Sequence, residues 1–378
     1  MIYQSMKRAL MGALMFVLSL GMVGAIYAKD DGVPAALKDL SIGGVMYLSY
    51  QNGQQLNPSD QLDSYNAFTL KRGYLDVKKG LTSNFMVRYT TDITRSNGSW
   101  NTRIKYLYGK YSLPQFLFFT QSGVEFGQVH VPWHDFEESI NGFRMQDPMF
   151  LERFGVFNSA DDGLTFGANF GGELSREYQA NVNKHYAGRY GSMQVGVYNG
   201  GGYHAAEMNE NKVVEARVTV RPIPEIVPGL QLTALDIYGK GNVATPPAGD
   251  LPDWTAFDGM VSYQSALLTL TGQYYTGSGN QSGSAIDGNG NALDQTGYSA
   301  FGAIHLGNSH QYSFIARYDM FDSNANSSTN DEVSLLIGGV AWQMNHSATW
   351  LLDYQRKDHS LNRLSAEDRV QVTLQTKF

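Results

Sequence analysis

Residues of alternating character, apolar then polar, recur along most of the chain. One parity from position 85 holds Phe85, Val87, Tyr89, Thr91 and Ile93, and the other holds Met86, Arg88, Thr90 and Asp92. The segment from position 312 repeats this, with Tyr312, Phe314, Ala316, Tyr318 and Met320 interleaving with Ser313, Ile315, Arg317 and Asp319. Because successive side chains of a strand point to opposite faces, the pattern predicts strands with one apolar and one polar face.

Such segments occur about sixteen times, at lengths suited to a tilted crossing of a bilayer. They lie near 42–50, 67–79, 85–93, 102–112, 121–130, 162–170, 190–199, 213–221, 230–241, 254–263, 266–275, 297–306, 312–320, 333–344, 347–357 and 368–378. Within hydrocarbon every backbone amide must pair internally, so strands can cross only as a closed sheet. We therefore predict an all-β fold, a transmembrane antiparallel β-barrel of about 16 strands.

The connections between these segments favour the same fold. The predicted outer loops are long and rich in Gly, Asn, Asp and Ser, and the predicted inner turns are short. The outer loops are 51–66, 131–161, 200–212, 242–253 and 276–296, and the inner turns are 80–82, 264–265, 307–310 and 345–346. One inner connection, 171–189, is too long, so it holds either an extra hairpin or an elaborated turn.

Residues 1–28 have the pattern of a secretory signal peptide. Lys7 and Arg8 precede an apolar run, which ends in small residues before Lys29. The alternative is a retained membrane anchor, since the apolar run almost reaches spanning length. We predict that residues 29–378 form the barrel and that the protein crosses the inner membrane.

Composition excludes several classes of protein and site. The formal net charge of -7 argues against a nucleic-acid binder, and the absence of cysteine removes disulfides, thiolate metal sites and cysteine nucleophiles. His130 and His134 have a helical spacing but no H-E-x-x-H context for zinc. The stretch 287–291 begins like a calcium loop but lacks its later ligands. We expect no metal and no cofactor.

Two further features favour an outer-membrane barrel. The segment 369–378 alternates to its end and closes on Phe378, the terminal strand pattern that barrel-assembly machinery reads; an ordinary edge strand is the alternative. Aromatic residues near segment ends are typical of girdles at a membrane surface. The candidate girdle residues are Tyr47, Tyr50, Tyr89, Tyr106, Tyr111, Tyr198, Tyr274, Tyr318, Trp350 and Tyr354.

About sixteen strands enclose a space too wide for side chains to fill, which predicts a water channel unless a loop plugs it. The polar parity carries the basic residues Arg72, Lys78, Arg88, Arg217, Arg221, Arg317, Lys357, Arg369 and Lys377, and the acids Asp76, Asp92, Glu215, Asp319 and Asp353. This excess of cations favours anions, unless the charges simply pair along the wall. Lys71 and Asp236 depart from the scheme, because their parity faces lipid unless they lie at an interface or at a subunit contact.

Several short motifs resemble the phosphate-selective porin O and P family. They are Gly127 to Trp133, the acidic stretch Asp135 to Glu138, Phe150-Leu151-Glu152-Arg153, Asp162 to Gly167, Val197 to Gly200, Ala216 to Pro222, Ala316 to Asp319 and Gly338 to Trp342. The resemblance implies a trimeric porin whose third outer loop, 131–161, folds into the lumen. It places Asp135, Glu137, Glu138, Arg144, Asp147, Glu152 and Arg153 near the constriction. Arg72, Arg88, Arg217 and Arg317 are the candidate rungs of the family's arginine ladder.

The resulting hypothesis is a homotrimeric porin in the outer membrane of a Gram-negative bacterium, in contact with lipid and lipopolysaccharide. It passes small hydrophilic solutes by passive diffusion and favours anions such as phosphate. Two alternatives remain. The barrel is a sheath for an electron-transfer partner, or it is a hydrolase built on a Ser/His or Asp/His constellation.

Overall fold

The computed structural model describes residues 37–378, except 97, 246–248, 308–309, 328–330 and 362–363. The predicted signal peptide, 1–28, lies outside the described residues. The compact unit Ser41–Phe378 carries the sheet. No helix in the described part of the chain has the length and apolarity needed to cross a membrane.

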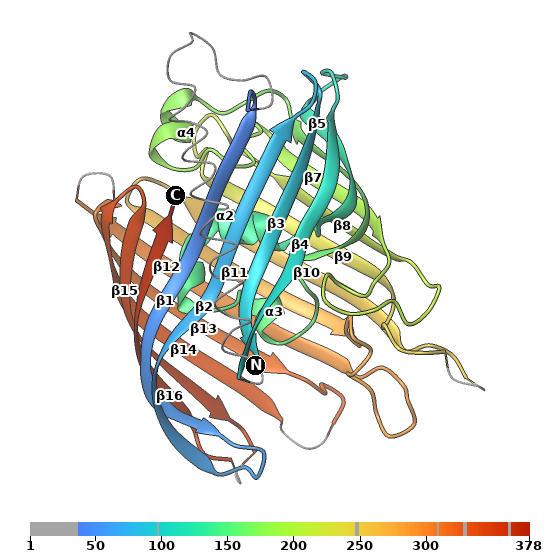
Figure 1. The fold of residues 1–378 in the computed structure, drawn as a ribbon, viewed down its shortest axis with the longest axis vertical. Coiled ribbons are helices and arrows are strands. Elements are labelled where there is room, and N and C mark those ends of the chain that lie inside the picture. The colour runs from blue at the N-terminus through green and yellow to red at the C-terminus, as the bar shows by residue number, and fades with distance from the viewer. Residues whose placement is uncertain (1–36, 97, 246–248, 308–309, 328–330, 362–363) are drawn as a thin grey trace, which may run out of the picture. The chain divides into compact units, whose positions relative to one another are not determined.

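Sixteen antiparallel strands form one closed barrel, as predicted (Figure 1). They are β1 (Leu40–Leu56), β2 (Leu62–Gly80), β3 (Phe85–Ser96), β4 (Ser99–Ser112), β5 (Phe119–His130), β6 (Ala160–Phe170), β7 (Gly191–Tyr198), β8 (Val213–Val220), β9 (Leu230–Lys240), β10 (Asp253–Gln264), β11 (Leu268–Ser278), β12 (Asp294–Leu306), β13 (Tyr312–Asp322), β14 (Glu332–Asn345), β15 (Ala348–His359) and β16 (Glu367–Lys377). Closure comes from pairing of β1 with β16. Each strand lies beside its neighbours in sequence, so every backbone edge is paired.

Two predicted connections differ in detail. The loop at 51–66 is shorter than expected, because β1 continues to Leu56 and β2 starts at Leu62. Gln51, Asn52, Gln54 and Gln55 lie in that extension, where both faces of the strand are polar and the alternation gives no signal. The long connection after β6 contains the helix α4 (Arg176–Asn181) and one isolated bridge, so it is an elaborated turn.

The outer face of the barrel is apolar and carries aromatic rows. Tyr312, Trp342 and Trp350 are direct cross-strand neighbours near one end, and Tyr274 pairs with Tyr298 toward the other. All five are exposed, as expected of side chains at a membrane surface. Three of the predicted girdle residues, Tyr47, Tyr106 and Tyr198, instead point inward and are buried, so that assignment was wrong.

The two residues outside the parity scheme behave differently. Asp236 does lie on the outer face, next to a polar row that includes Thr255, Thr276 and Thr296, where the apolar band ends. Lys71 instead points into the lumen, where its Nζ lies 2.6 Å from Asp147 Oδ1. The expectation that Lys71 faces lipid was wrong, because the alternation breaks between Lys71 and Arg72 and both side chains contact the inner loop.

The last residue of the chain seals the barrel against β1. Gly44 and Phe378 exchange two backbone hydrogen bonds, at 3.0 and 3.1 Å. The Phe378 ring and the β2 backbone leave no room at Gly44, because an added Cβ would come within 2.5 Å of Phe378 Cζ and 2.7 Å of the Tyr74 carbonyl oxygen.

Replacing Gly44 by Val should therefore lower the yield of closed barrel, because the new side chain would push β1 away from β2 or the terminal ring. The folded fraction is read from the heat-dependent shift of the band in denaturing electrophoresis. Gly272→Val is the matched control, since a Cβ at this strand glycine meets nothing within 4 Å. Equal folding of the two variants would contradict the proposed seal.

Candidate constriction and its loop

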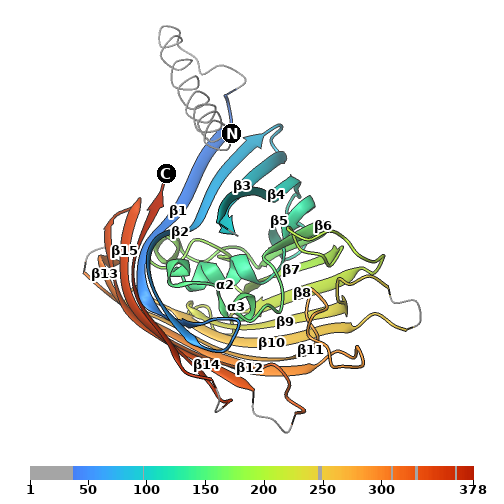
Figure 2. The same ribbon diagram turned by 60° about the horizontal axis from the view of Figure 1, so that its bottom comes forward.

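The segment between β5 and β6 folds into the barrel, as Figure 2 shows, and carries the helices α2 (His134–Ile140) and α3 (Phe150–Arg153) and the 3-10 turn η1 (Arg144–Gln146). One side of it is apolar. Trp133, Phe136, Phe150 and Phe157 pack against wall residues of β4 to β11 and β13, in a single buried cluster that includes Trp254. Burial of this apolar surface anchors the segment to the barrel wall.

Two wall arginines hold the loop backbone. Arg217 is fully buried, and its Nε donates to the Pro132 carbonyl oxygen at 2.9 Å while its guanidinium lies 4.1 Å from the Phe136 ring centroid. Arg317 donates from Nη1 to the Pro148 carbonyl oxygen at 3.0 Å. Both were predicted as pore-lining. The loop path covers them, so the structure places them between loop and wall.

The other side of the loop is tied to β2 and β16 by charge. Asp147 pairs with Lys71 and also accepts from Arg369. Glu152 pairs with Arg72 at 3.1 Å and with Arg144 at 2.8 Å. Gln355 and Gln371 add hydrogen bonds to the Gln146 carbonyl oxygen. The loop therefore reaches across the lumen instead of lining one wall only.

Further predicted cations are paired along the wall. Arg88 donates from Nε to Asp76 at 2.6 Å and contacts His130 at 2.9 Å, and Lys78 pairs with the same Asp76 at 3.1 Å. Lys357 pairs with Glu367 at 2.9 Å. Arg221 is buried at the end of β8, where it donates to the Pro228 carbonyl oxygen. For Lys78, Arg88 and Lys357 the structure favours the alternative in which wall charges pair with each other.

Strand β4 holds charged residues that the sequence pattern did not bring forward. Arg103 pairs with Asp92 at 2.8 Å, and Lys110 pairs with Glu125 at 3.2 Å. Between them, Lys105 lies in a β-bulge, because Thr91 pairs with Ile104 while Thr90 pairs with Tyr106. The sequence carries a signal for this bulge, because charged residues occupy odd positions at 103 and 105 but an even position at 110, so the polar parity changes along the strand.

Glu138 of α2 faces this bulged wall. It pairs with Arg144 at 2.9 Å, and Lys105 and Tyr47 are both within its electrostatic reach. Asp135 is nearby and accepts from the Tyr186 hydroxyl at 2.7 Å. Burial opposes ionisation of Asp135, but His130 and the other donors around it outweigh burial and lower its pKa. The residues predicted for the constriction therefore do lie inside the barrel, and α2 presents carboxylates toward tyrosine and lysine.

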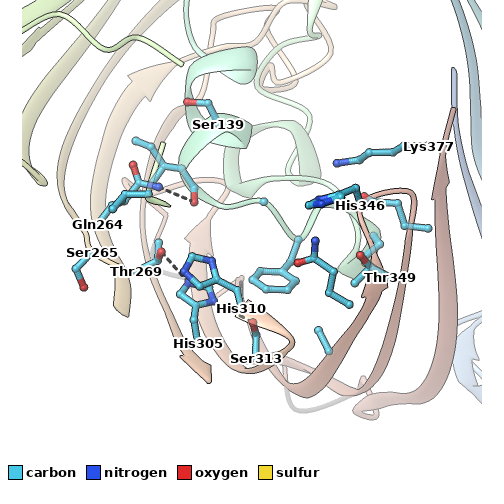
Figure 3. A pocket seen from close by; sticks show the side chains of 18 residues that line it. Ser139, Gln264, Ser265, Thr269, His305, His310, Ser313, His346, Thr349 and Lys377 are labelled. Atoms are coloured by element: carbon cyan, nitrogen blue, oxygen red, sulfur yellow. Dashed lines mark hydrogen bonds between the residues drawn. The ribbon is translucent and has the colours of Figure 1, made fainter. Parts of the chain in front are cut away.

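Several cavities border the loop. One, of about 410 Å³, is lined by Lys78, Arg88, Lys110, Glu125 and Asp135, among others. Another, of about 240 Å³, is shown in Figure 3, where His305 and His310 lie together and His346 and Lys377 lie opposite them. His305 is hydrogen-bonded to Thr269 and Ser313, at 3.1 and 2.9 Å. The lining is polar, as expected of a path for hydrophilic solutes.

The described residues include no group of histidines and carboxylates arranged to hold a metal ion. His130 and His134 diverge: His130 stacks on Tyr106 in the wall, with ring centroids 4.1 Å apart, and His134 is buried against Phe157 in the loop. Burial lowers the pKa of His134 to about 4, so its ring is neutral near pH 7.

Comparisons with known proteins give a fold. No family model and no curated protein matches the chain. Among solved structures it is similar to the anion-selective porin from Comamonas acidovorans, with 11% identity over 90% of this chain and 99% of that one and a TM-score of 0.59. OmpT of Vibrio cholerae matches with 9% identity over 90% and 97%, at 0.58.

The outer-membrane channel DcaP of Acinetobacter baumannii matches with 12% identity over 90% of this chain and 97% of that chain, at a TM-score of 0.53. At these identities the comparisons establish the fold alone. The chain is a closed β-barrel of the kind found in the outer membrane of Gram-negative bacteria. The resemblance to the phosphate-selective porin family finds no matching family model.

One loop carboxyl makes the loop sensitive to pH. Glu137 is buried and accepts hydrogen bonds from Trp133 Nε1 at 2.9 Å and Gln273 Nε2 at 2.5 Å. Burial raises its pKa from 4.5 to about 7, although Arg317 opposes the shift. Since the packed state binds this proton more tightly, the contribution of Glu137 to its stability is fully present below about pH 4.5 and is lost as pH rises to about 7, by about 3 kcal/mol at most.

Hydrogen exchange of α2, corrected for intrinsic rates, should accordingly show greater protection at pH 5 than at pH 8. Glu137→Gln should remove most of this difference, because the amide cannot ionise. Glu177→Gln in α4, which is exposed, serves as the control and should keep it. A pH response that survives Glu137→Gln would show that another group is responsible.

Proposed function

We propose that this barrel is a passive diffusion channel of the outer membrane that favours small anionic, hydrophilic solutes such as phosphate. The observation that carries the proposal is the loop 131–159 inside a closed barrel with an apolar outside and a charged inside. Such a loop narrows a lumen that sixteen strands leave wide. It also occupies the space that a sheathed electron-transfer partner would need, which argues against that alternative.

The preference for anions does not rest on net charge. Lys71, Arg103, Lys105 and Lys110 join the predicted wall cations, but Glu125, Asp161, Asp258 and Glu367 join the acids, so the cationic excess of the wall is unchanged. The loop then contributes mainly carboxylates: Asp135, Glu137, Glu138, Asp147 and Glu152 against Arg144 and Arg153. What an ion meets is therefore decided by which charges lack partners.

The acids Glu215 and Asp258 do not reduce the preference of the channel for anions. Both are fully buried in the barrel wall. One flanking cavity is lined by Lys78, Arg88 and Lys110 and also by Glu125 and Asp135. Each of these cations is paired with a carboxylate, which weakens its attraction for an anion. Several shallow cationic contacts of this kind let an anion move onward without being held, which is what conduction requires.

A trimer is part of the proposal. OmpT of Vibrio cholerae, one of the proteins with this fold, has been described in a trimer form. Crosslinking of the detergent-solubilised protein should give a species of three times the chain mass. A crosslinking ladder that stops at the single chain would contradict the trimer and leave the channel proposal intact.

The channel is tested by single-channel recording in planar bilayers under a potassium chloride gradient. We expect discrete conductance steps and a reversal potential displaced toward that of chloride. Folded protein that gives no steps would contradict the channel. A reversal potential displaced toward potassium would contradict only the preference for anions.

Shortening the constriction should widen the path. Deletion of 135–153 should increase the single-channel conductance, because it removes the segment that crosses the lumen while the strand pairing of the barrel remains. Deletion of 287–291, an exposed tip of another outer loop, is the matched control and should leave conductance unchanged. Equal conductance of both variants would show that the loop does not limit the current.

A further inference from the structure

Lys105 stands out among the cations that face the lumen. Lys105 is buried, with a relative exposure of 8%. No carboxylate lies within ion-pair distance of its ammonium group in the part of the chain that the structure describes. Among the described residues, the Lys105 side chain makes one polar contact, with the Tyr74 hydroxyl, 3.4 Å from Nζ, and the Tyr74 and Tyr106 ring centroids lie 4.7 and 5.4 Å away. An ammonium group carries three donors, so most of its hydrogen-bonding capacity is unused.

The Tyr74 hydroxyl adds a second donor at the same place. It accepts from Arg72 Nη1 at 3.1 Å as well as from Lys105 Nζ, so two cations occupy its lone pairs. Both partners are donors only, and the hydroxyl proton remains available to a third group. A group that accepts from Tyr74 and Lys105 together must carry lone pairs, and negative charge strengthens both bonds.

The backbone that carries Lys105 is held from the opposite side of the wall. Gln128 of β5 donates from Nε2 to the carbonyl oxygens of Ile104 and Lys105, at 2.7 and 3.0 Å. These carbonyls belong to the bulge, where regular pairing with β3 is interrupted. Gln128 thus holds two backbone carbonyl groups at the bulge that carries Lys105.

We propose that Lys105 Nζ and Tyr74 Oη form a transient binding site for a small anion, and that Gln128 is a positioning residue for it. The site rests on the proposed channel function and assigns its charge selectivity to one place. Arg72 contributes positive charge but is occupied by Glu152 and Asp92. Glu138, facing Lys105 from α2, opposes tight binding, so an anion stops there only briefly.

Removal of the charge tests the site directly. Lys105→Met should lower the chloride-to-potassium permeability ratio roughly tenfold, equivalent to about 1.4 kcal/mol. Lys240→Met is the control with the same charge change, since Lys240 pairs with Asp253 at the outer end of β9. If the wild type shows conductance steps and Lys105→Met leaves the permeability ratio unchanged, the binding site is overturned but the channel is not. A wild type without steps would overturn the channel itself.

Removal of a single hydrogen-bond donor tests the binding site without changing its charge. Tyr74→Phe should weaken block of the chloride current by inorganic phosphate severalfold, while the conductance in chloride alone changes less. Tyr111→Phe, on the outer face, is the control. Unchanged phosphate block in Tyr74→Phe would show that Tyr74 is not part of the site. This variant tests the site even if Lys105→Met folds poorly.

Gln128→Leu tests the positioning role. Lys105 and its charge remain, so a role in stability alone predicts less folded protein with unchanged selectivity. The positioning role predicts a folded channel whose permeability ratio moves toward that of Lys105→Met. Combining Gln128→Leu with Lys105→Met should then add little. Full additivity of the two changes would contradict a shared site.

Discussion

The requirement that every backbone amide find a partner away from water determines the rest of this structure. In hydrocarbon an open sheet edge is too costly, so the strands continue until β16 reaches β1. Sixteen strands are more than side chains can fill, and the interior must therefore be occupied by water or by chain. The segment between β5 and β6 supplies the chain. The closed outer wall thus creates both the lumen and the need for a loop that divides it.

The loop is held by two different kinds of contact on its two sides. Toward β4–β11 and β13 it buries aromatic rings such as Trp133 and Phe136, and this apolar burial is non-directional and strong. Toward β2 and β16 it uses ion pairs centred on Asp147 and Glu152, which depend on geometry and solvent. Tyr106 and Tyr108 of β4 join the same apolar cluster, and Glu138 of α2 lies within electrostatic reach of Lys105 in the β4 bulge.

Period-two alternation predicted the strand number, the closure and the inward direction of Arg88 and Arg317, because each depends only on local pattern and on the need to close. It failed for Lys71 and did not find Lys105. At both places the strand inserts or slips by a residue, and a one-residue change moves every later side chain to the other face. The burial of Arg217 was beyond the pattern for another reason: it depends on where a distant loop runs.

The pairing of β1 with β16 has a consequence for the order of folding. This ladder joins segments far apart in sequence, such as Ser49 and Thr373, which are 324 positions apart. The entropy of closing so long a loop must be offset before the contacts form, so this pairing is intrinsically slow. Until it forms, β1 and β16 each keep an unpaired edge, which is open to pairing with other chains.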